Sequence, residues 1–428
     1  MSSENPIIRQ LPPKSREVFN AVWDSLAPAD QRSLKTLITG FPSDSAMLRV
    51  LVKLSADQIK MTFGSKHRVA IVGPANVGKS TLYNLLIQNK HDRAEVSPLP
   101  GTTRTNQSAD AGLFNIVDTP GADAVGYVGA LEQEQALQAA READFLVIVF
   151  DAIQGIKQTE LELYQTLLSY GKPYIVVLNK IDLVRKESQR VLQLAAQHLE
   201  LTPEQIIPVV ARTGENLDKV LLAIAATEPG IVAALGAALP QYRWRLAWRS
   251  IVSAASIAAA IALIPLPILD FGPLLVTQSM MVLGIARIYN YKITAARARE
   301  LAVTFGLGFL GRSLFAQLSK LGGLPGWLLA AAIASSTTVV MGYAAAIWFE
   351  KGERLSNESL KKLTAVMTQS LLSRLKSLGK KGRPDQQTLK QQVEQALEEA
   401  AIGTDRSILD QQAQASASAG EDEILLDG

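Results

Sequence analysis

The sequence predicts an α/β domain with a mostly parallel six-stranded sheet and helices on both faces, followed by an all-α C-terminal half. Five apolar runs alternate with amphipathic stretches between about residues 67 and 228, a pattern typical of parallel strands buried on both faces. A glycine-rich loop follows the first run and opens a predicted helix. Beyond residue 229 the chain is rich in Ala and Leu, and residues 251–269 and 321–349 contain no charged side chain.

The composition limits the chemistry open to the chain. A length of 428 residues exceeds one ordinary hydrophobic core, which predicts two or three structural units. Because there is no cysteine, disulfides, thiolate zinc sites and cysteine nucleophiles are excluded. The formal charge of +3 is too small to indicate a nucleic-acid partner. A mean hydropathy of +0.13 with only 19% charged residues indicates that apolar residues are concentrated in particular segments.

Shifts in composition divide the chain into five predicted parts. Prolines interrupt short amphipathic helices near the N-terminus, and these helices are expected to pack on the α/β domain that follows them. No apolar stretch follows basic residues at the start of the chain, so no secretion signal is predicted and the α/β domain is expected in the cytoplasm. The parts are a helical N-terminal extension (1–66), the α/β domain (67–228), an apolar helical domain (229–350), amphipathic helices (351–402) and a disordered tail (403–428).

The loop "GPANVGKST" fits the phosphate-binding pattern GxxxxGK[ST] between a predicted strand and a predicted helix, the context that this pattern requires. Its backbone N–H groups are expected to surround a β-phosphate, because a helix N-terminus favours anions and a Cβ at the glycines would obstruct the backbone. Lys79 is predicted to reach the β- and γ-phosphates, and the Ser80 hydroxyl to ligate Mg²⁺. The predicted nucleotide contacts of this loop are Gly73, Asn76, Val77, Gly78, Lys79, Ser80 and Thr81.

Two further motifs close later apolar runs. In "DTPG", Asp118 can hold the water shell of the magnesium ion, and the Gly121 amide can donate to the γ-phosphate. In "NKID", Asp182 offers two carboxylate oxygens to N1–H and the N2 amine of guanine, donors that adenine lacks. The order of these motifs along the chain therefore predicts a guanine nucleotide, GTP or GDP, as the ligand.

Neighbouring residues are expected to complete the base site. Asn179 and Lys180 should brace the phosphate loop and cover the ring. The main-chain N–H of Ala211 in "VVARTGEN" can reach guanine O6, and Arg212 beside it is also predicted to contact the nucleotide.

Residues 67 to about 226 resemble GTPases of the Era and TrmE-like group, on the motifs "NVGKS", "PGTTR", "DTPG" and "NKID". The resemblance implies hydrolysis of GTP to GDP and phosphate with Mg²⁺. It also implies that Thr103, in "PGTTR", is the switch I residue that ligates Mg²⁺ and senses the γ-phosphate. By its residues alone, the threonine pair can also be a plain loop cap. Because fourteen residues separate Thr103 from Asp118, the strand pair between them is expected to be short, with a tight turn near "ADAG".

Hydrolysis is expected to be slow. Ras-type enzymes orient the attacking water with a glutamine just after the segment that corresponds to "DTPG", and this chain has Ala122 there, whose methyl group cannot polarise water. The resemblance implies that Asn76 helps to hold a K⁺ ion beside the phosphates, so K⁺ is expected to increase the rate. Asn76 can also simply tolerate the backbone angles of the loop. The residues predicted to serve catalysis are Lys79, Thr103, Gly121 and Asn76.

The apolar half contains two candidate membrane segments. Residues 251–286 are too short for two spans, so a helical hairpin that partly penetrates the membrane is expected, with flanking Arg and Lys at cytoplasmic ends. Residues 327–349 carry Trp327 and Trp348 near their ends and could form one span. The alternative is a bundle of alanine-rich helices that bury one another. The stretch "PLPILDFGPLL" resembles a domain of unknown function found beside Era-like GTPases and in bacterial inner-membrane proteins.

These observations predict a regulatory GTPase coupled to a membrane-associated helical domain. Its expected partners are membrane lipid and an unknown protein effector, with a homodimer through the GTPase domain as a further option. Two alternatives stay open: a GTPase of RNA or ribosome assembly, and a GTP-stabilised scaffold that does not hydrolyse its ligand. Nucleic acid is not expected as a partner, because the sequence has no GxxG-type KH loop and no basic stripe with interleaved aromatics.

Overall fold

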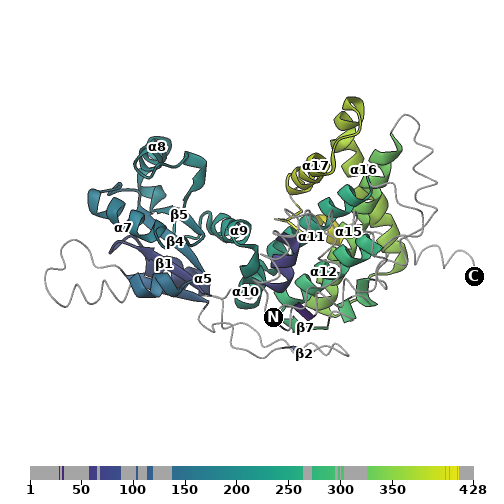
Figure 1. Ribbon diagram of the computed structural model, residues 1–428, viewed down its shortest axis with the longest axis horizontal. Helices are drawn as coiled ribbons and strands as arrows, with labels where there is room; N and C mark the ends of the chain where they lie inside the picture. The colour runs from purple at the N-terminus through teal and green to yellow at the C-terminus, as the bar shows by residue number, and fades with distance from the viewer. Residues whose placement is uncertain are drawn as a thin grey trace, which may run out of the picture. The chain divides into compact units, whose positions relative to one another are not determined.

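The computed structural model divides the chain into two compact units. We call Ser65–Glu95 with Asn106–Tyr242 the sheet unit, and Met1–Gly64, Val96–Thr105 and Arg243–Gly428 the helical unit. Figure 1 shows the elements of both. The structure describes residues 28, 31–32, 57–64, 68–87, 103–104, 113–118, 137–263, 272–294, 297–298, 300–302, 325–400, 402–403, 405–411 and 413.

The sheet unit is built on a parallel sheet of five strands. All neighbouring strands pair in parallel, so their carboxyl ends meet at one edge of the sheet. The central strands are apolar and buried along their whole length, as parallel strands covered on both faces must be. In spatial order the strands are β3 (Phe114–Asp118), β1 (Val69–Gly73), β4 (Phe145–Asp151), β5 (Tyr174–Asn179) and β6 (Ile206–Pro208).

Helices cover both faces of this sheet. Successive side chains of a strand point to opposite faces. On one face, alternate residues of β1, β4 and β5 pack against α7 and α8, and on the other α5 contacts β1 and β3 while α9 contacts β5. The helices of the unit that the structure bounds include α5 (Lys79–Ile87), α7 (Gln158–Leu168), α8 (Ser188–His198), α9 (Leu217–Thr227) and α10 (Val232–Ala238), and residues 137–142 are helical too. The predicted α/β architecture is thereby confirmed.

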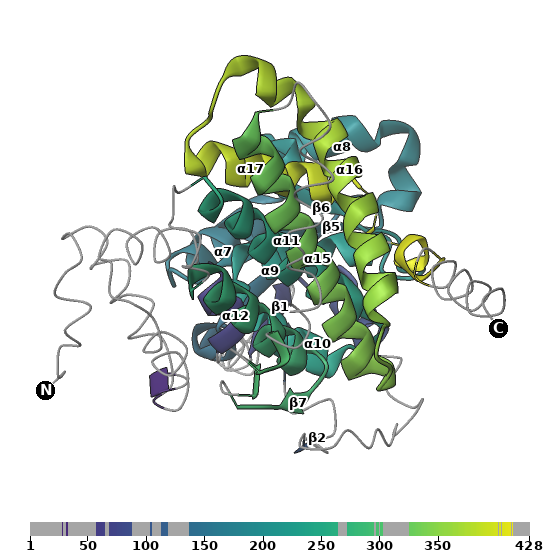
Figure 2. The same cartoon turned by 90° about the vertical axis from the view of Figure 1, so that its right-hand side faces the viewer.

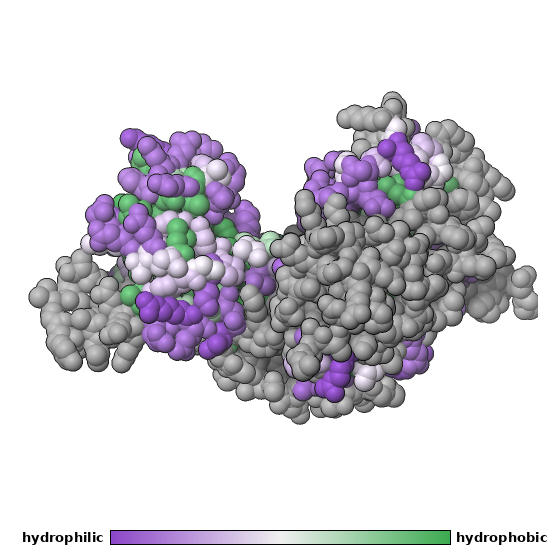
Figure 3. Space-filling model, in the orientation of Figure 1, coloured by the Kyte–Doolittle hydropathy of each residue, from purple (hydrophilic) through white to green (hydrophobic). Residues whose placement is uncertain are grey.

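The face of the sheet unit seen in Figure 3 is mostly hydrophilic where it is coloured, with scattered apolar spots. Its large apolar side chains that the structure describes as exposed are Ile153, Leu168, Leu183 and Leu194. Single apolar side chains of this kind are normal on a globular domain.

The sixth predicted strand pairs elsewhere. The sequence predicts a strand pair between Thr103 and Asp118, but β2 (Thr103–Arg104) pairs antiparallel with β7 (Tyr291–Lys292), both within the helical unit. Thr103 lies opposite Lys292, and Arg104 opposite Tyr291. The hydrogen bonds of β2 are thus made with the backbone of β7, whereas the sequence spacing predicts a local hairpin. The predicted turn of that hairpin, near "ADAG", lies outside the described residues.

The helical unit is a bundle around α11. All side chains from Leu246 to Ile261 except that of Arg249 are buried, because α12, α15 and α17 all pack on this helix. Figure 2 shows these helices within the bundle. The main helices are α11 (Arg243–Ile261), α12 (Gly272–Ile288), α15 (Gly326–Lys351), α16 (Asn357–Lys381) and α17 (Gln386–Glu398).

Gly342 allows α15 to approach α11 closely. A Cβ at this position would lie 2.5 Å from Ile251 Cγ1 and 3.1 Å from Met281 Sδ. We therefore expect Gly342→Ala to lower the free energy of unfolding of the helical unit by about 1–3 kcal/mol, as overpacking does in well-packed cores. Gly326→Ala, on the same helix, is the matched control, because a Cβ there has no atom within 4 Å.

Tryptophan fluorescence during urea unfolding provides the measurement, since all five tryptophans belong to the helical unit. Equal denaturation midpoints for the two variants would contradict this packing.

Helix α15 meets the length and composition expected of a membrane span. Its mean hydropathy reaches 1.6, yet 83% of that apolar window is buried among other parts of the protein. Within the described residues it is the one straight helix that qualifies, and a pair bent by 112°, Leu217–Thr227 with Pro229–Ala238, qualifies if taken as one span. The apolar side chains of α15, predicted to meet lipid, are therefore packed mostly against other parts of the protein. This packing is the one expected of the alternative, a bundle of alanine-rich helices that bury one another. The turn of the predicted 251–286 hairpin lies partly outside the described residues.

The described helix of the predicted N-terminal extension packs within the helical unit. Residues 57–63 form a helix in which Gln58 Nε2 donates to Ser250 Oγ at 3.1 Å and Thr62 Oγ1 donates to the Met280 carbonyl at 3.0 Å. Arg287 donates to the Thr62 carbonyl at 2.5 Å. The expectation that this extension packs on the α/β domain is wrong for these residues, because their partners come from α11 and α12, about 200 residues away in sequence.

The predicted disordered tail is partly ordered. Residues 407–411 are helical, and Leu409 is 1% exposed. Tyr343 Oη donates to Asp410 Oδ1 at 2.6 Å, and Trp244 Nε1 donates to the Ile402 carbonyl at 3.0 Å. A few apolar and charged side chains in this polar segment are enough to bind it to α11 and α15.

Candidate functional site

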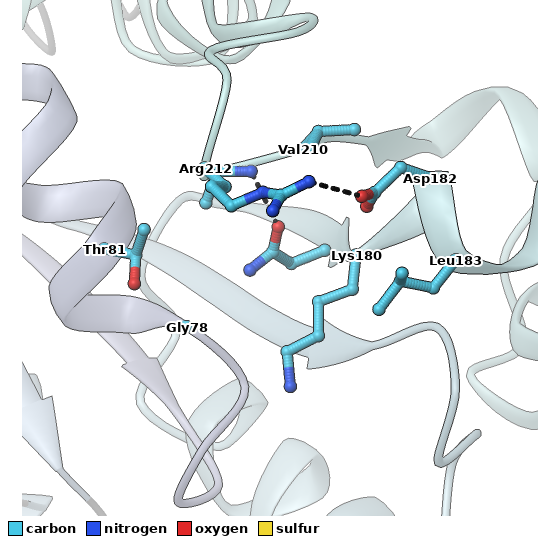
Figure 4. A pocket seen from close by; sticks show the side chains of 9 residues that line it. Gly78, Thr81, Lys180, Asp182, Leu183, Val210 and Arg212 are labelled. Atoms are coloured by element: carbon cyan, nitrogen blue, oxygen red, sulfur yellow. Dashed lines mark hydrogen bonds and ion pairs between the residues drawn. The ribbon is translucent and has the colours of Figure 1, made fainter.

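A pocket opens at the carboxyl edge of the parallel sheet, the usual place for ligands in α/β folds. Its volume is about 260 Å³. Figure 4 shows side chains from the phosphate loop, from the β5 loop and from the segment after β6 around it. The lining residues are Gly78, Thr81, Asn179, Lys180, Asp182, Leu183, Val210, Ala211 and Arg212.

The phosphate loop runs from β1 into α5, and its glycines are required by space. A Cβ on Gly73 would lie 2.2 Å from the Val149 carbonyl oxygen. Gly78 has φ +95°, which favours glycine, and a Cβ there would lie 2.3 Å from Asn179 Nδ2. The backbone can therefore pass close to its neighbours only without side chains at these positions.

Lys79 lies inside this loop. Its side chain is buried, and Nζ donates to the carbonyls of Gly73 at 2.7 Å and Pro74 at 2.5 Å. The ammonium is thereby held at the N-terminus of α5, where a phosphate oxygen would be an alternative acceptor. Ser80 and Thr81 follow it in the first turn and are exposed.

The "NKID" residues brace the phosphate loop as predicted. Asn179 Nδ2 donates to the Val77 carbonyl at 2.8 Å, while its Oδ1 accepts from the Ala211 N–H at 2.9 Å. Lys180 Nζ donates to the Asn76 carbonyl at 2.7 Å. The Ala211 N–H, predicted to reach guanine O6, donates to Asn179 in this structure and so connects the segment after β6 to the "NKID" loop.

Asp182 faces Arg212 across the pocket (Figure 4). The Asp182 side chain is 19% exposed, and its Oδ2 lies 3.9 Å from an Arg212 guanidinium nitrogen. At this distance, and with Arg212 82% exposed, the pair contributes little to stability. Both carboxylate oxygens of Asp182 thus stay available for donors on a base.

Two family models match separate parts of the chain. Residues 68–180 match the family described as "50S ribosome-binding GTPase", and residues 237–377 match a "Domain of unknown function (DUF697)". Residues 68–180 form an Era/Der-like GTPase domain. The resemblance to Era-like GTPases and the C-terminal domain of unknown function are both confirmed.

Curated relatives of the GTPase domain include two bacterial proteins. GTPase Era from Aquifex aeolicus (strain VF5) is 37% identical over 172 residues, covering 36% of this chain and 54% of that protein. GTPase Der from Gloeobacter violaceus is 34% identical over 171 residues, covering 37% and 38%. The chain thus spans about half or less of the length of these relatives.

Among solved structures, Aquifex aeolicus Era bound to GDP·AlF₄⁻ is 29% identical. The match covers 46% of this chain and 67% of that chain, with a TM-score of 0.30.

The GTPase domain brings together only part of the predicted magnesium site. Asp118 ends β3 directly opposite Gly73, so its backbone lies at the start of the phosphate loop. Thr103, by contrast, belongs to β2 in the helical unit. Gly121 and Ala122 lie outside the described residues. Within the described part of the chain, no group of three or more His, Asp or Glu side chains could hold a metal ion.

Asn76 has a conformational role in the GTPase domain. Its φ of +63° lies in the left-handed region, which Asn tolerates better than most residues. Its side chain is exposed. The second of the two interpretations of Asn76, tolerance of the loop's backbone angles, is therefore sufficient to explain the residue.

One buried acid beside the site did not stand out in the sequence. Asp151 ends β4, is 2% exposed, and accepts from Lys180 Nζ at 2.6 Å and from the Ile153 N–H at 2.8 Å. The signal was present in "FLVIVFD", where an acid closes an apolar strand just as Asp118 closes "FNIVD".

Proposed function

We propose that the chain binds GTP and GDP in the pocket of its GTPase domain and hydrolyses GTP to GDP and phosphate. One observation carries the proposal: Asn179 and Lys180 connect the phosphate loop to the Asp182 loop, so that a base site and a phosphate site form one pocket. Two carboxylate oxygens at Asp182 match the paired donors of guanine. The named GTPase relatives support the same ligand.

Magnesium fits the oxygen donors that the sequence places beside the phosphate loop. The Ser80 hydroxyl at the start of α5 and the Asp118 carboxylate at the end of β3 are oxygen ligands of the kind that Mg²⁺ prefers. When bound, the ion would neutralise charge on the phosphates. A K⁺ ion at Asn76 is proposed only because of the resemblance to Era and TrmE-like GTPases. Slow hydrolysis is proposed because Ala122 stands where Ras-type enzymes have the glutamine that orients water.

Calorimetry tests the ligand. We expect heat on addition of GDP or GTP with Mg²⁺, and at least about 100-fold weaker binding of ATP, since adenine offers no paired donors to Asp182. Phosphate release is then measured with GTP in KCl and in NaCl. No binding of GTP, or equal binding of ATP, would refute the proposed function. Binding without phosphate release in KCl would instead favour the GTP-stabilised scaffold.

We also propose that the nucleotide state is transmitted to the helical unit. The segment around Thr103, between the phosphate loop and β3 in sequence, pairs with β7 of that unit, which supports this route. Membrane attachment of the helical unit stays a prediction, supported by the length and hydropathy of α15. Fractionation of the full-length protein with an alkaline carbonate wash tests it, and complete recovery in the soluble fraction would contradict it.

A role at the ribosome is the second candidate. The family matched by residues 68–180 is described as ribosome-binding, which favours it. Salt-sensitive co-sedimentation of the protein with ribosomes would support this candidate, and its absence would count against it.

A further inference from the structure

Asp151 is a buried carboxylate that the proposed nucleotide contacts do not use. It lies at the carboxyl end of β4, in register with Asn179 of β5. Both of its oxygens have partners, because Oδ1 accepts from the Ile153 N–H at 2.8 Å and Oδ2 accepts from Lys180 Nζ at 2.6 Å. A carboxylate held on both sides in this way is a rigid anchor for the lysine.

Lys180 transfers this anchoring to the phosphate loop. Its ammonium donates both to Asp151 and, at 2.7 Å, to the carbonyl of Asn76. Its backbone φ of +64° is left-handed, so the residue is held in a conformation that a lysine rarely adopts alone. With two acceptors at fixed positions, the ammonium has little freedom to leave the loop.

The direction of the carbonyls determines the direction of the amides. In a trans peptide the C=O and the following N–H point in opposite directions. The Asn76 carbonyl points to Lys180 and the Val77 carbonyl points to Asn179. The N–H groups of Val77 and Gly78, which belong to the same two peptides, therefore point away from the "NKID" residues, toward the inside of the loop where a phosphate would lie.

The charge of Asp151 also matters. A buried carboxylate near a site for a polyphosphate would repel the ligand unless a cation neutralised it. Lys180 is that cation, at 2.6 Å. Asp151 is therefore useful to phosphate binding beside Lys180 and harmful to it without that lysine.

We propose that Asp151 is a positioning residue for nucleotide binding, acting through Lys180 on the amides of the phosphate loop. The inference rests on the proposed function, since it concerns guanine nucleotides in this pocket. It predicts an unusual sign: loss of Asp151 weakens GDP binding when Lys180 is present and strengthens it when Lys180 is replaced.

The experiment is a double-mutant cycle with GDP and Mg²⁺ on the full chain. We expect Asp151→Asn to weaken GDP binding about tenfold, the loss of one charge-assisted hydrogen bond, and Lys180→Met about 100-fold. The double variant should bind at least about threefold more tightly than Lys180→Met alone. The inference would be overturned if Asp151→Asn lowered GDP affinity by the same factor with Lys180 present and with Lys180 replaced. It would also be overturned if Asp151→Asn alone bound GDP within twofold of the original chain.

Asp144→Asn is the matched control for general effects of the same side-chain change. Asp144 is half-buried and, like Asp151, accepts a backbone N–H, that of Arg68 at 3.1 Å, but it directly precedes β4, at the amino end of the strand whose carboxyl end carries Asp151. We expect the GDP affinity of this variant to be unchanged. Equal losses of GDP affinity in Asp151→Asn and Asp144→Asn would overturn the inference. If Lys180→Met does not fold, this comparison decides the inference alone. Absence of GDP binding in the unmodified chain would refute the proposed function itself.

Discussion

Replacement of Asp182 by asparagine is expected to change the base that the protein binds. The carboxylate can accept from both N1–H and the N2 amine of guanine, whereas the asparagine amide accepts only once and turns an N–H donor toward the amine. The loss of about two charge-assisted hydrogen bonds corresponds to about 3–6 kcal/mol, so GTP affinity should fall at least about 100-fold. Asp182 is mostly covered by the protein, which limits compensation by water.

The same substitution should create affinity for xanthosine triphosphate. Xanthine carries a C2 carbonyl in place of the guanine amine, so the asparagine N–H finds an acceptor there. Competition of GTP and xanthosine triphosphate for a fluorescent nucleotide measures both affinities on the original chain and on Asp182→Asn. If the variant keeps its preference for GTP, Asp182 does not recognise the base and the interpretation of the pocket is wrong.

Replacement of Lys79 by methionine is expected to abolish tight binding of the phosphates. The ammonium is held inside the loop by the Gly73 and Pro74 carbonyls, at the start of α5. Its loss removes charge-assisted hydrogen bonds to the phosphates, about 1.5–3 kcal/mol each, and should weaken GTP and GDP binding about 100- to 1000-fold. Methionine keeps the apolar stem of the side chain, so the buried packing is largely preserved.

Lys219→Met on α9 is the control for this substitution, because it removes the same charge from an exposed position outside the pocket. Calorimetry with GDP and Mg²⁺ should show binding for Lys219→Met close to that of the original chain. Thermal unfolding without nucleotide should be similar for both variants. A Lys79→Met protein that is folded and binds GDP within threefold of the control would contradict the assigned role.

Much of the GTPase domain was predictable because its signals are local. The phosphate loop is a short continuous segment whose glycines, lysine and following helix act within a few residues of one another. The apolar strands were recognisable because burial on both faces excludes polar side chains along each whole run. The roles of Asn179 and Lys180 in bracing that loop followed from their motif, and their hydrogen bonds confirm them.

Three features of the site could not be read from motifs. Spacing suggested a hairpin after Thr103, but the partner strand β7 lies almost 190 residues further along the chain. The hydrogen bond from the Ala211 N–H to Asn179 Oδ1 joins a residue that follows β6 to the last residue of β5, and no single motif contains both. Asp151 looked like the ordinary end of a strand until the parallel register placed it beside the residue that precedes Lys180.

Sequence by itself determined the phosphate loop, the position of Asp182 as the acid predicted to select guanine, and the alternation of buried strands with helices. Each of these depends on neighbours within one segment. Tertiary structure alone decided which strand pairs with β2, that α15 is covered by other helices, and that Asp151 meets Lys180. The physical reason is that hydrogen-bond partners and buried faces are chosen among segments brought together by the fold, and local spacing contains no information about those choices.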